Sequence, residues 1–97
     1  MSIIAEGSFP DPASDFCNIV YWLSKESDVT IKVFTVSGEV VVDNMKISGS
    51  KGYNSFYWDG KNRFKRIVAS GVYIYRITAR TADNEAASAL RKMSIVR

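Results

Sequence analysis

The sequence predicts an all-β fold, an antiparallel β-sandwich of about six to seven strands in one domain. Short apolar segments alternate with polar residues at a period of two, the spacing of side chains on one face of a strand. Turn-forming residues interrupt these segments about every 8–12 residues. A chain of 97 residues, 46% of them hydrophobic, can form one packed core but not two independent ones.

The first two strands are predicted over residues 18–23 and 29–36, with a polar turn between them. Their apolar side chains alternate, so one face of each strand is expected to enter the core. Trp22 falls on the opposite face. We therefore expect it to be exposed, to pack across strands, or to contact another domain.

The remaining strands follow turns that contain glycine or polar residues. Gly38 lies in a Ser-Gly-Glu segment, where a tight hairpin requires a positive φ. The strand after it is expected to bend near Asp43 and Asn44, which are unfavourable inside strands. The ranges predicted for these strands are 40–47, 53–58, 71–79 and 90–96.

The shared alternation predicts which side chains form the core. These residues are large, apolar or aromatic, and each falls on the inward face of its predicted strand. They are Ile19, Tyr21, Leu23, Val29, Ile31, Val33, Phe56, Trp58, Tyr75 and Ile77.

The chain is predicted to consist of a linker or N-terminal extension at residues 1–15 and a single domain at residues 16–97. No apolar run reaches the roughly 18 residues that a membrane-spanning helix needs, so membrane insertion is not expected. The first residues lack the basic and apolar regions of a signal peptide. If the protein is secreted, we expect its signal peptide upstream of this fragment.

Several function classes lose support from the composition. The sequence has no histidine, the commonest general base near neutral pH. Its one cysteine, Cys17, has no histidine partner, and its carboxylates are scattered among turns. Asp11 and Asp15 could at most contribute to a weak cation site. We therefore predict no catalytic residues, no cofactor and no metal.

The segments "VTIKVFTVSGEVV", "YNSFYWDG", "VASGVYIYRITA" and "RKMSIVR" resemble the Ig-like domain of flagellar hook-capping proteins and related C-terminal modules of secreted bacterial proteins. The chain is also similar, more loosely, to the sorting domains used by type IX secretion. The resemblance covers residues 9–97 and implies an Ig-like or fibronectin-III-like sandwich. Its most specific part is Trp-Asp-Gly followed by Ser-Gly-Val-Tyr-x-Tyr-Arg.

The residues around Trp-Asp-Gly also have structural roles without the resemblance. Trp58 can close one end of a sandwich, and the Asp59 carboxylate can accept backbone N–H groups in a turn. Gly60 tolerates a left-handed conformation. Gly71 is expected to allow a close approach of the backbone before the tyrosines that follow it.

The loop after Trp-Asp-Gly departs from the resemblance. Related domains carry an acidic, glycine-containing loop there, whereas this chain has Lys61, Arg63, Lys65 and Arg66. That difference weakens any cation-binding role. We expect this loop to be exposed at one end of the sandwich and to contact an acidic partner surface. That surface would belong to the preceding domain or to a second copy of the chain. The candidate acidic complements are Asp11, Asp15, Glu26 and Asp28.

The resemblance implies a non-catalytic C-terminal accessory module of a larger secreted or surface protein of bacteria. Its partners would be a neighbouring domain of the parent protein, a second copy, or export or anchoring machinery. The expected location is extracellular or at the cell surface. The alternative is a ligand-binding module, with carbohydrate ahead of nucleic acid, because a net charge of +3 is low for a nucleic-acid binder. An aromatic platform with a polar rim would favour carbohydrate, and a flat apolar patch would favour protein contact.

Overall fold

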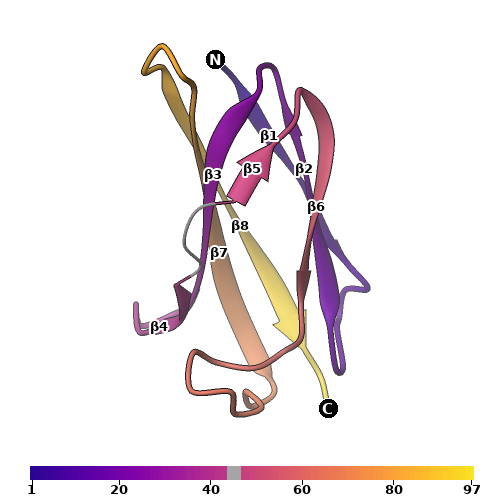
Figure 1. The fold of residues 1–97 in the computed structure, drawn as a ribbon. Helices are drawn as coiled ribbons and strands as arrows, with labels where there is room; N and C mark the ends of the chain where they lie inside the picture. Colours follow the sequence, from indigo (N-terminus) through magenta and orange to yellow (C-terminus); the bar gives the residue numbers. More distant parts are fainter. Residues whose placement is uncertain (44–46) are drawn as a thin grey trace.

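A computed structural model describes residues 1–43 and 47–97, which form eight strands (Figure 1). The all-β prediction is confirmed, and every pairing between strands is antiparallel. The strands are β1 (Ile3–Phe9), β2 (Cys17–Leu23), β3 (Ser27–Thr35), β4 (Val40–Asp43), β5 (Ile47–Gly49), β6 (Gly52–Trp58), β7 (Gly71–Arg80) and β8 (Ala86–Ile95).

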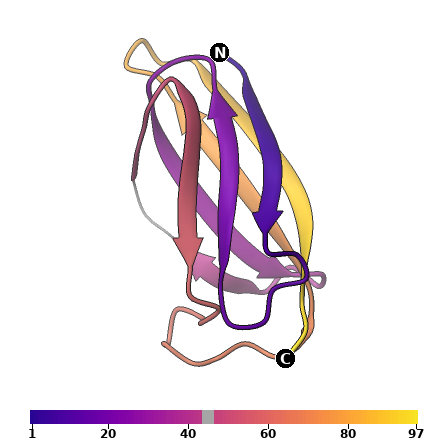
Figure 2. The same ribbon diagram turned by 90° about the vertical axis from the view of Figure 1, so that its right-hand side faces the viewer.

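The strands form two packed sheets, and in Figure 2 the sheet of β1, β2 and β6 lies in front of the other. One sheet has three strands in the order β1-β2-β6. The other has the order β4-β3-β7-β8, and β5 also pairs with β3. This arrangement is an antiparallel sandwich in which each sheet contributes one face to the core.

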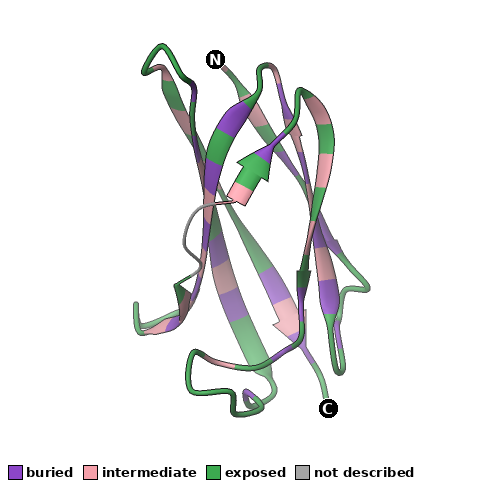
Figure 3. Cartoon of the chain, viewed as in Figure 1, coloured by how far each residue is buried: buried purple, intermediate pink, exposed green. Residues whose placement is uncertain are grey.

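Burial follows the predicted alternation along the strands (Figure 3). In β2 every second residue is buried, from Cys17 to Leu23. The expected core residues of β3 and β7 are also buried, as is Trp58 at the end of β6. Phe56 is the exception, because it is only partly buried in β6, a strand that pairs with β2 alone among the described strands. The inward parity is therefore as predicted in each of these strands.

The N-terminal segment differs from its prediction. Residues 1–15 are expected to be a linker or an extension, but Ile3–Phe9 form β1 and pair with β2. Further along, Ala13 bridges to Ile95 in the other sheet, and its N–H donates to the Ser94 carbonyl at 2.9 Å. The prediction fails here because the register shifts between Ala5 and Gly7, which interrupts the period of two.

The predicted number of strands is also too low. The segment at 40–47 contains two short strands, β4 and β5, which pair with different parts of β3. Of the two residues at the predicted bend, Asp43 is the last residue of β4, and Asn44 lies outside the described residues. Gly38 has the expected positive φ of 94° in the turn between β3 and β4.

The two chain ends lie at opposite ends of the molecule, whose principal extents are 41 × 22 × 20 Å (Figure 1). The long connection between β6 and β7 lies at the same end as the C-terminus. The turns between β2 and β3 and between β7 and β8 lie at the other end, with the N-terminus. The predicted cationic loop is thus about the length of the sandwich away from Met1.

Candidate partner-binding loop

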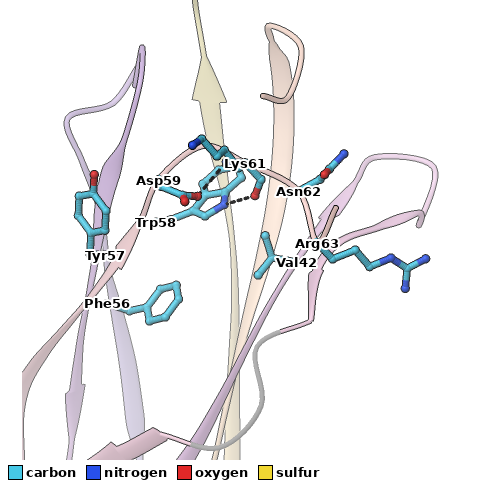
Figure 4. A pocket seen from close by; sticks show the side chains of 8 residues that line it. All are labelled: Val42, Phe56, Tyr57, Trp58, Asp59, Lys61, Asn62 and Arg63. Atoms are coloured by element: carbon cyan, nitrogen blue, oxygen red, sulfur yellow. Dashed lines mark hydrogen bonds between the residues drawn. The ribbon is translucent and has the colours of Figure 1, made fainter. Parts of the chain in front are cut away.

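The end of β6 anchors the loop that connects it to β7 (Figure 4). Trp58 is only 3% exposed, and its indole N–H donates a hydrogen bond to the Lys61 carbonyl at 2.9 Å. Its ring meets that of Tyr73 edge to face, with centroids 6.1 Å apart. The Asp59 carboxylate accepts the Lys61 backbone N–H at 3.0 Å. The Trp-Asp pair therefore fixes the first turn of the loop from inside the sandwich.

Gly60 is required at this turn for two reasons. Its φ of 72° lies in the left-handed region, and a Cβ there would be 2.6 Å from the Asp15 carbonyl oxygen. Gly71 has no such role, because the nearest atom to a Cβ at that position is on the Tyr73 ring at 4.0 Å. The expected close approach at Gly71 is therefore wrong, and it occurs at Gly60 instead.

Arg97 holds the base of the loop from the C-terminal end of the chain. Its Nε–H donates to the Val68 carbonyl at 2.7 Å, and its Nη2 donates to the Gly60 carbonyl at 3.1 Å. Its backbone N–H donates to the Ser70 hydroxyl at 2.9 Å. The same guanidinium lies 3.6 Å from the Asp15 carboxylate. These contacts connect both ends of the loop to the last residue, a role that the sequence analysis missed.

Asn62 organises the tip of the loop. Its side-chain oxygen accepts the backbone N–H groups of Phe64 at 2.9 Å and of Arg66 at 3.1 Å. The Asn62 N–H donates to the Arg66 carbonyl, and the Lys65 N–H donates to the Asn62 carbonyl. Lys65 has a φ of 63°, so the chain reverses tightly there. An asparagine at this place before a turn is a sequence signal for this geometry.

The four cationic side chains project from this fixed frame. Lys61, Arg63, Lys65 and Arg66 are all exposed, and none forms an ion pair with a described residue. Phe64 between them is 69% exposed, with the Arg63 guanidinium 5.1 Å from its ring centroid. An ordered loop of unpaired cations around an exposed ring suits an acidic surface.

A shallow pocket adjoins the loop on the side of β6 (Figure 4). Its volume is about 330 Å³, and apolar side chains meet the charged rim of the loop there. The lining residues are Val42, Phe56, Tyr57, Trp58, Asp59, Lys61, Asn62 and Arg63. The pocket places the first two loop cations beside apolar surface, as at the rim of a protein interface.

The candidate acidic residues divide between the two ends of the molecule. Asp11 and Asp15 lie at the loop's own end, where Asp15 faces Arg97 and Asp11 accepts the Ser94 N–H at 3.2 Å. Glu26 and Asp28 lie at the opposite end, beside the turn between β2 and β3. No carboxylate of these four pairs with a loop cation within the described chain.

Cys17 does not have the properties of a catalytic nucleophile. It is fully buried, and burial raises the pKa of its thiol to about 11. Its Sγ lies 3.9 Å from the Met93 sulfur.

Among the residues that the structure describes, no three His, Cys, Asp or Glu side chains gather as metal ligands would. Residues 1–43 and 47–97 also contain no helix long and apolar enough to span a membrane.

The sequence matches the family described as "Secretion system C-terminal sorting domain" over residues 8–90. The chain belongs to this family. Such sorting domains are non-enzymatic modules recognised by type IX secretion machinery, and they are attached to parent proteins exported to the cell surface or the extracellular space. The resemblance predicted from the Trp-Asp-Gly and Arg-Lys-Met segments is therefore confirmed. A comparison with curated proteins found no match.

Solved structures share the fold of this sorting domain. Dimeric latent PorU from Porphyromonas gingivalis superposes with a TM-score of 0.77 at 16% identity, over 99% of this chain and 10% of PorU. FLGD from P. aeruginosa superposes with a TM-score of 0.71 at 23% identity, over 95% of this chain and 70% of FLGD. PorZ, a surface component of the type-IX secretion system of P. gingivalis, superposes with a TM-score of 0.56 at 18% identity. The match covers 93% of this chain and 11% of PorZ. The chain thus spans about a tenth of PorU and of PorZ.

Proposed function

We propose that this sorting domain uses the cationic loop to contact an acidic surface of the export machinery. The observation that carries the proposal is the Asn62-organised loop, which presents four exposed cations that form no ion pair with any described residue. Because the backbone of the tip is already ordered, little conformational entropy is lost when a partner binds. The cations would raise the rate of encounter with an acidic surface and fix its orientation.

The position of the loop supports a partner that approaches from the C-terminal end. Met1 lies at the opposite end of the sandwich, so a domain that packs against the N-terminal end would not reach the loop (Figure 1). A second copy could place either its Glu26 and Asp28 or its Asp11 and Asp15 against the loop, so contact between copies needs a separate test. We favour the export machinery because the chain belongs to the sorting-domain family.

We also propose that the domain has no catalytic activity of its own. Histidine is absent from the sequence, and the thiol of Cys17 is buried with a raised pKa. A catalytic nucleophile instead needs a lowered pKa or an adjacent base. In this proposal the domain serves its parent protein through recognition alone.

The test compares export of a reporter protein fused to two charge variants of the domain in a bacterium with this secretion system. The first variant replaces Lys61, Arg63, Lys65 and Arg66 with glutamine. The control replaces Lys51, Arg76, Arg80 and Lys92, which are two lysines and two arginines exposed elsewhere. Both variants lose four charges, and both should keep a nearly unchanged Tm because exposed charges contribute little to stability.

We expect the loop variant to lose most of its surface-exposed reporter, while the control exports normally. Equal export of the two variants would contradict a role for the loop. Light scattering of the purified domain at low and high salt tests self-association separately. A salt-sensitive dimer that only the loop variant dissociates would assign the loop to contact between copies.

A further inference from the structure

The outer face of the three-stranded sheet carries exposed aromatic and aliphatic side chains. One cross-strand row consists of Ile4, Trp22 and Tyr53, which are register partners on β1, β2 and β6. A second row, four residues away along β2, contains Phe9 and Tyr57 on either side of a polar residue. Tyr53 is 72% exposed, Tyr57 59%, Phe9 55% and Ile4 52%. We call this surface the aromatic face.

The rings of the aromatic face lie on a rigid support. Phe16, just before β2, stacks on Tyr57 with centroids 5.6 Å apart and an interplanar angle of 26°. Trp22 is partly buried between its partners Ile4 and Tyr53 in the central strand of the sheet. Side chains held by a sheet and by each other need little ordering when a ligand binds.

The chemistry of the face is neutral. In the whole of β1, β2 and β6, Glu6 is the only charged residue. Between the two aromatic rows lie Val20 and Ser55, and Asn18 separates the second-row rings. The outer face of the other sheet differs, since Arg76 and Lys92 project there. A ligand for the aromatic face therefore needs apolar surfaces and hydroxyl groups but no charge.

The dimensions of the face favour a small ligand over a second copy of the chain. Three strands at a spacing of about 4.8 Å and seven residues at about 3.4 Å each give a projected area of roughly 340 Å². A stable protein interface buries about 800 Å² of accessible surface on each partner, more than a face of this projected area is expected to offer. The rows themselves are about 13 Å apart, which suits a chain of several linked rings.

We propose that the aromatic face binds a neutral oligosaccharide. A pyranose ring has an apolar surface of C–H groups that stacks on the electron-rich face of an aromatic ring. Its hydroxyl groups lie at the ring edge, where they can exchange hydrogen bonds with the side chains of Asn18 and Ser55. The two aromatic rows would hold separate sugar rings of one chain, with the polar residues between them.

The experiment titrates the purified domain with cellohexaose, laminarihexaose, chitohexaose and maltohexaose, followed by calorimetry and by tryptophan fluorescence. Trp22 lies on the face and Trp58 is buried, so binding should change the emission of Trp22. We expect at least one sugar to bind, with Tyr53→Ala and Tyr57→Ala each weakening the affinity about three- to tenfold. Both tyrosines are exposed, so their variants should fold normally.

Leu90→Ala is the matched control, because Leu90 has the same 59% exposure as Tyr57 but lies on the outer face of the other sheet. It should leave the affinity unchanged. The proposal is overturned if none of the four sugars binds, or if both tyrosine variants bind as the wild type does. It is also overturned if the wild type sediments as a dimer that Tyr53→Ala dissociates, because the face would then be a contact between copies.

Discussion

Replacing Trp58 by alanine tests whether the Trp-Asp-Gly segment acts first as architecture. The indole closes the end of the sandwich below the cationic loop, where it is 3% exposed. It contacts Tyr73 through its ring and the Lys61 carbonyl through its N–H. Trp58→Ala removes the buried ring, the edge-to-face pair and the hydrogen bond together, and all three losses destabilise the folded state.

The expected cost of Trp58→Ala is about 3–5 kcal/mol of unfolding free energy, the range for buried large-to-small aromatic changes. A domain of this size has a total stability of about 5–15 kcal/mol. Since each kcal/mol shifts Tm by about 4–8 °C in small domains, Tm should fall by at least roughly 12 °C. Trp58→Phe keeps most of the ring and loses the donor to Lys61, so it should cost only about 1–2 kcal/mol.

Urea unfolding and thermal melts, both followed by circular dichroism, measure these differences, with Trp22→Ala as the control. Trp22 is an equally large side chain, but it is only partly buried on the outer face of its sheet. The free energy of unfolding should be lowest for Trp58→Ala, higher for Trp22→Ala and highest for the wild type. A Tm shift of one or two degrees for Trp58→Ala would show that Trp58 is peripheral and would refute the architectural role.

Two further predictions concern the ends of the sandwich. A hydrogen bond from Lys25 lowers the pKa of Glu85 below its ordinary value of 4.5. The folded-state pKa is below the unfolded value, so the stabilisation is present above about pH 4.5 and is lost as pH falls through the lowered pKa. The Tm advantage of wild type over Glu85→Gln, small because the group is exposed, should vanish across that range in thermal melts. Gly60→Ala should lower Tm, because the added Cβ would collide with the Asp15 carbonyl. It should also release the loop, which would be seen as faster amide exchange at residues 60–66. An unchanged Tm and exchange rate would contradict the close approach.

The sequence is sufficient to predict the fold class and most of the core because alternation encodes them directly. Ile19, Tyr21 and Leu23 are read correctly since one face of β2 is buried along its whole length. The prediction fails where alternation is broken or short. β1 contains a register shift after Ala5, and β5 has only three residues, so neither gives a period-two signal.

The candidate loop is predictable in its composition but not in its geometry. Four cations near a Trp-Asp-Gly turn can be read from the sequence, and their exposure follows from the cost of burying charge. The contacts that fix the loop come from distant residues. Arg97 lies 37 positions from Gly60, and no local pattern shows that its guanidinium meets that carbonyl. The role of Gly60 likewise depends on Asp15, which the fold brings to the same turn.

The frame of the loop and its charges are supplied by different residues, and this separation explains how its electrostatics can change while the fold persists. The frame consists of Gly60, Asn62 and Arg97, which act through backbone atoms, the Asn62 amide oxygen and the Arg97 guanidinium. The side chains of Lys61 and Arg66 make no contribution to those hydrogen bonds. Exposed charges add little to stability, so acidic residues could occupy the same positions on the same backbone. The resemblance to hook-capping domains implies such an acidic loop, and a change of partner then requires new side chains but no new fold.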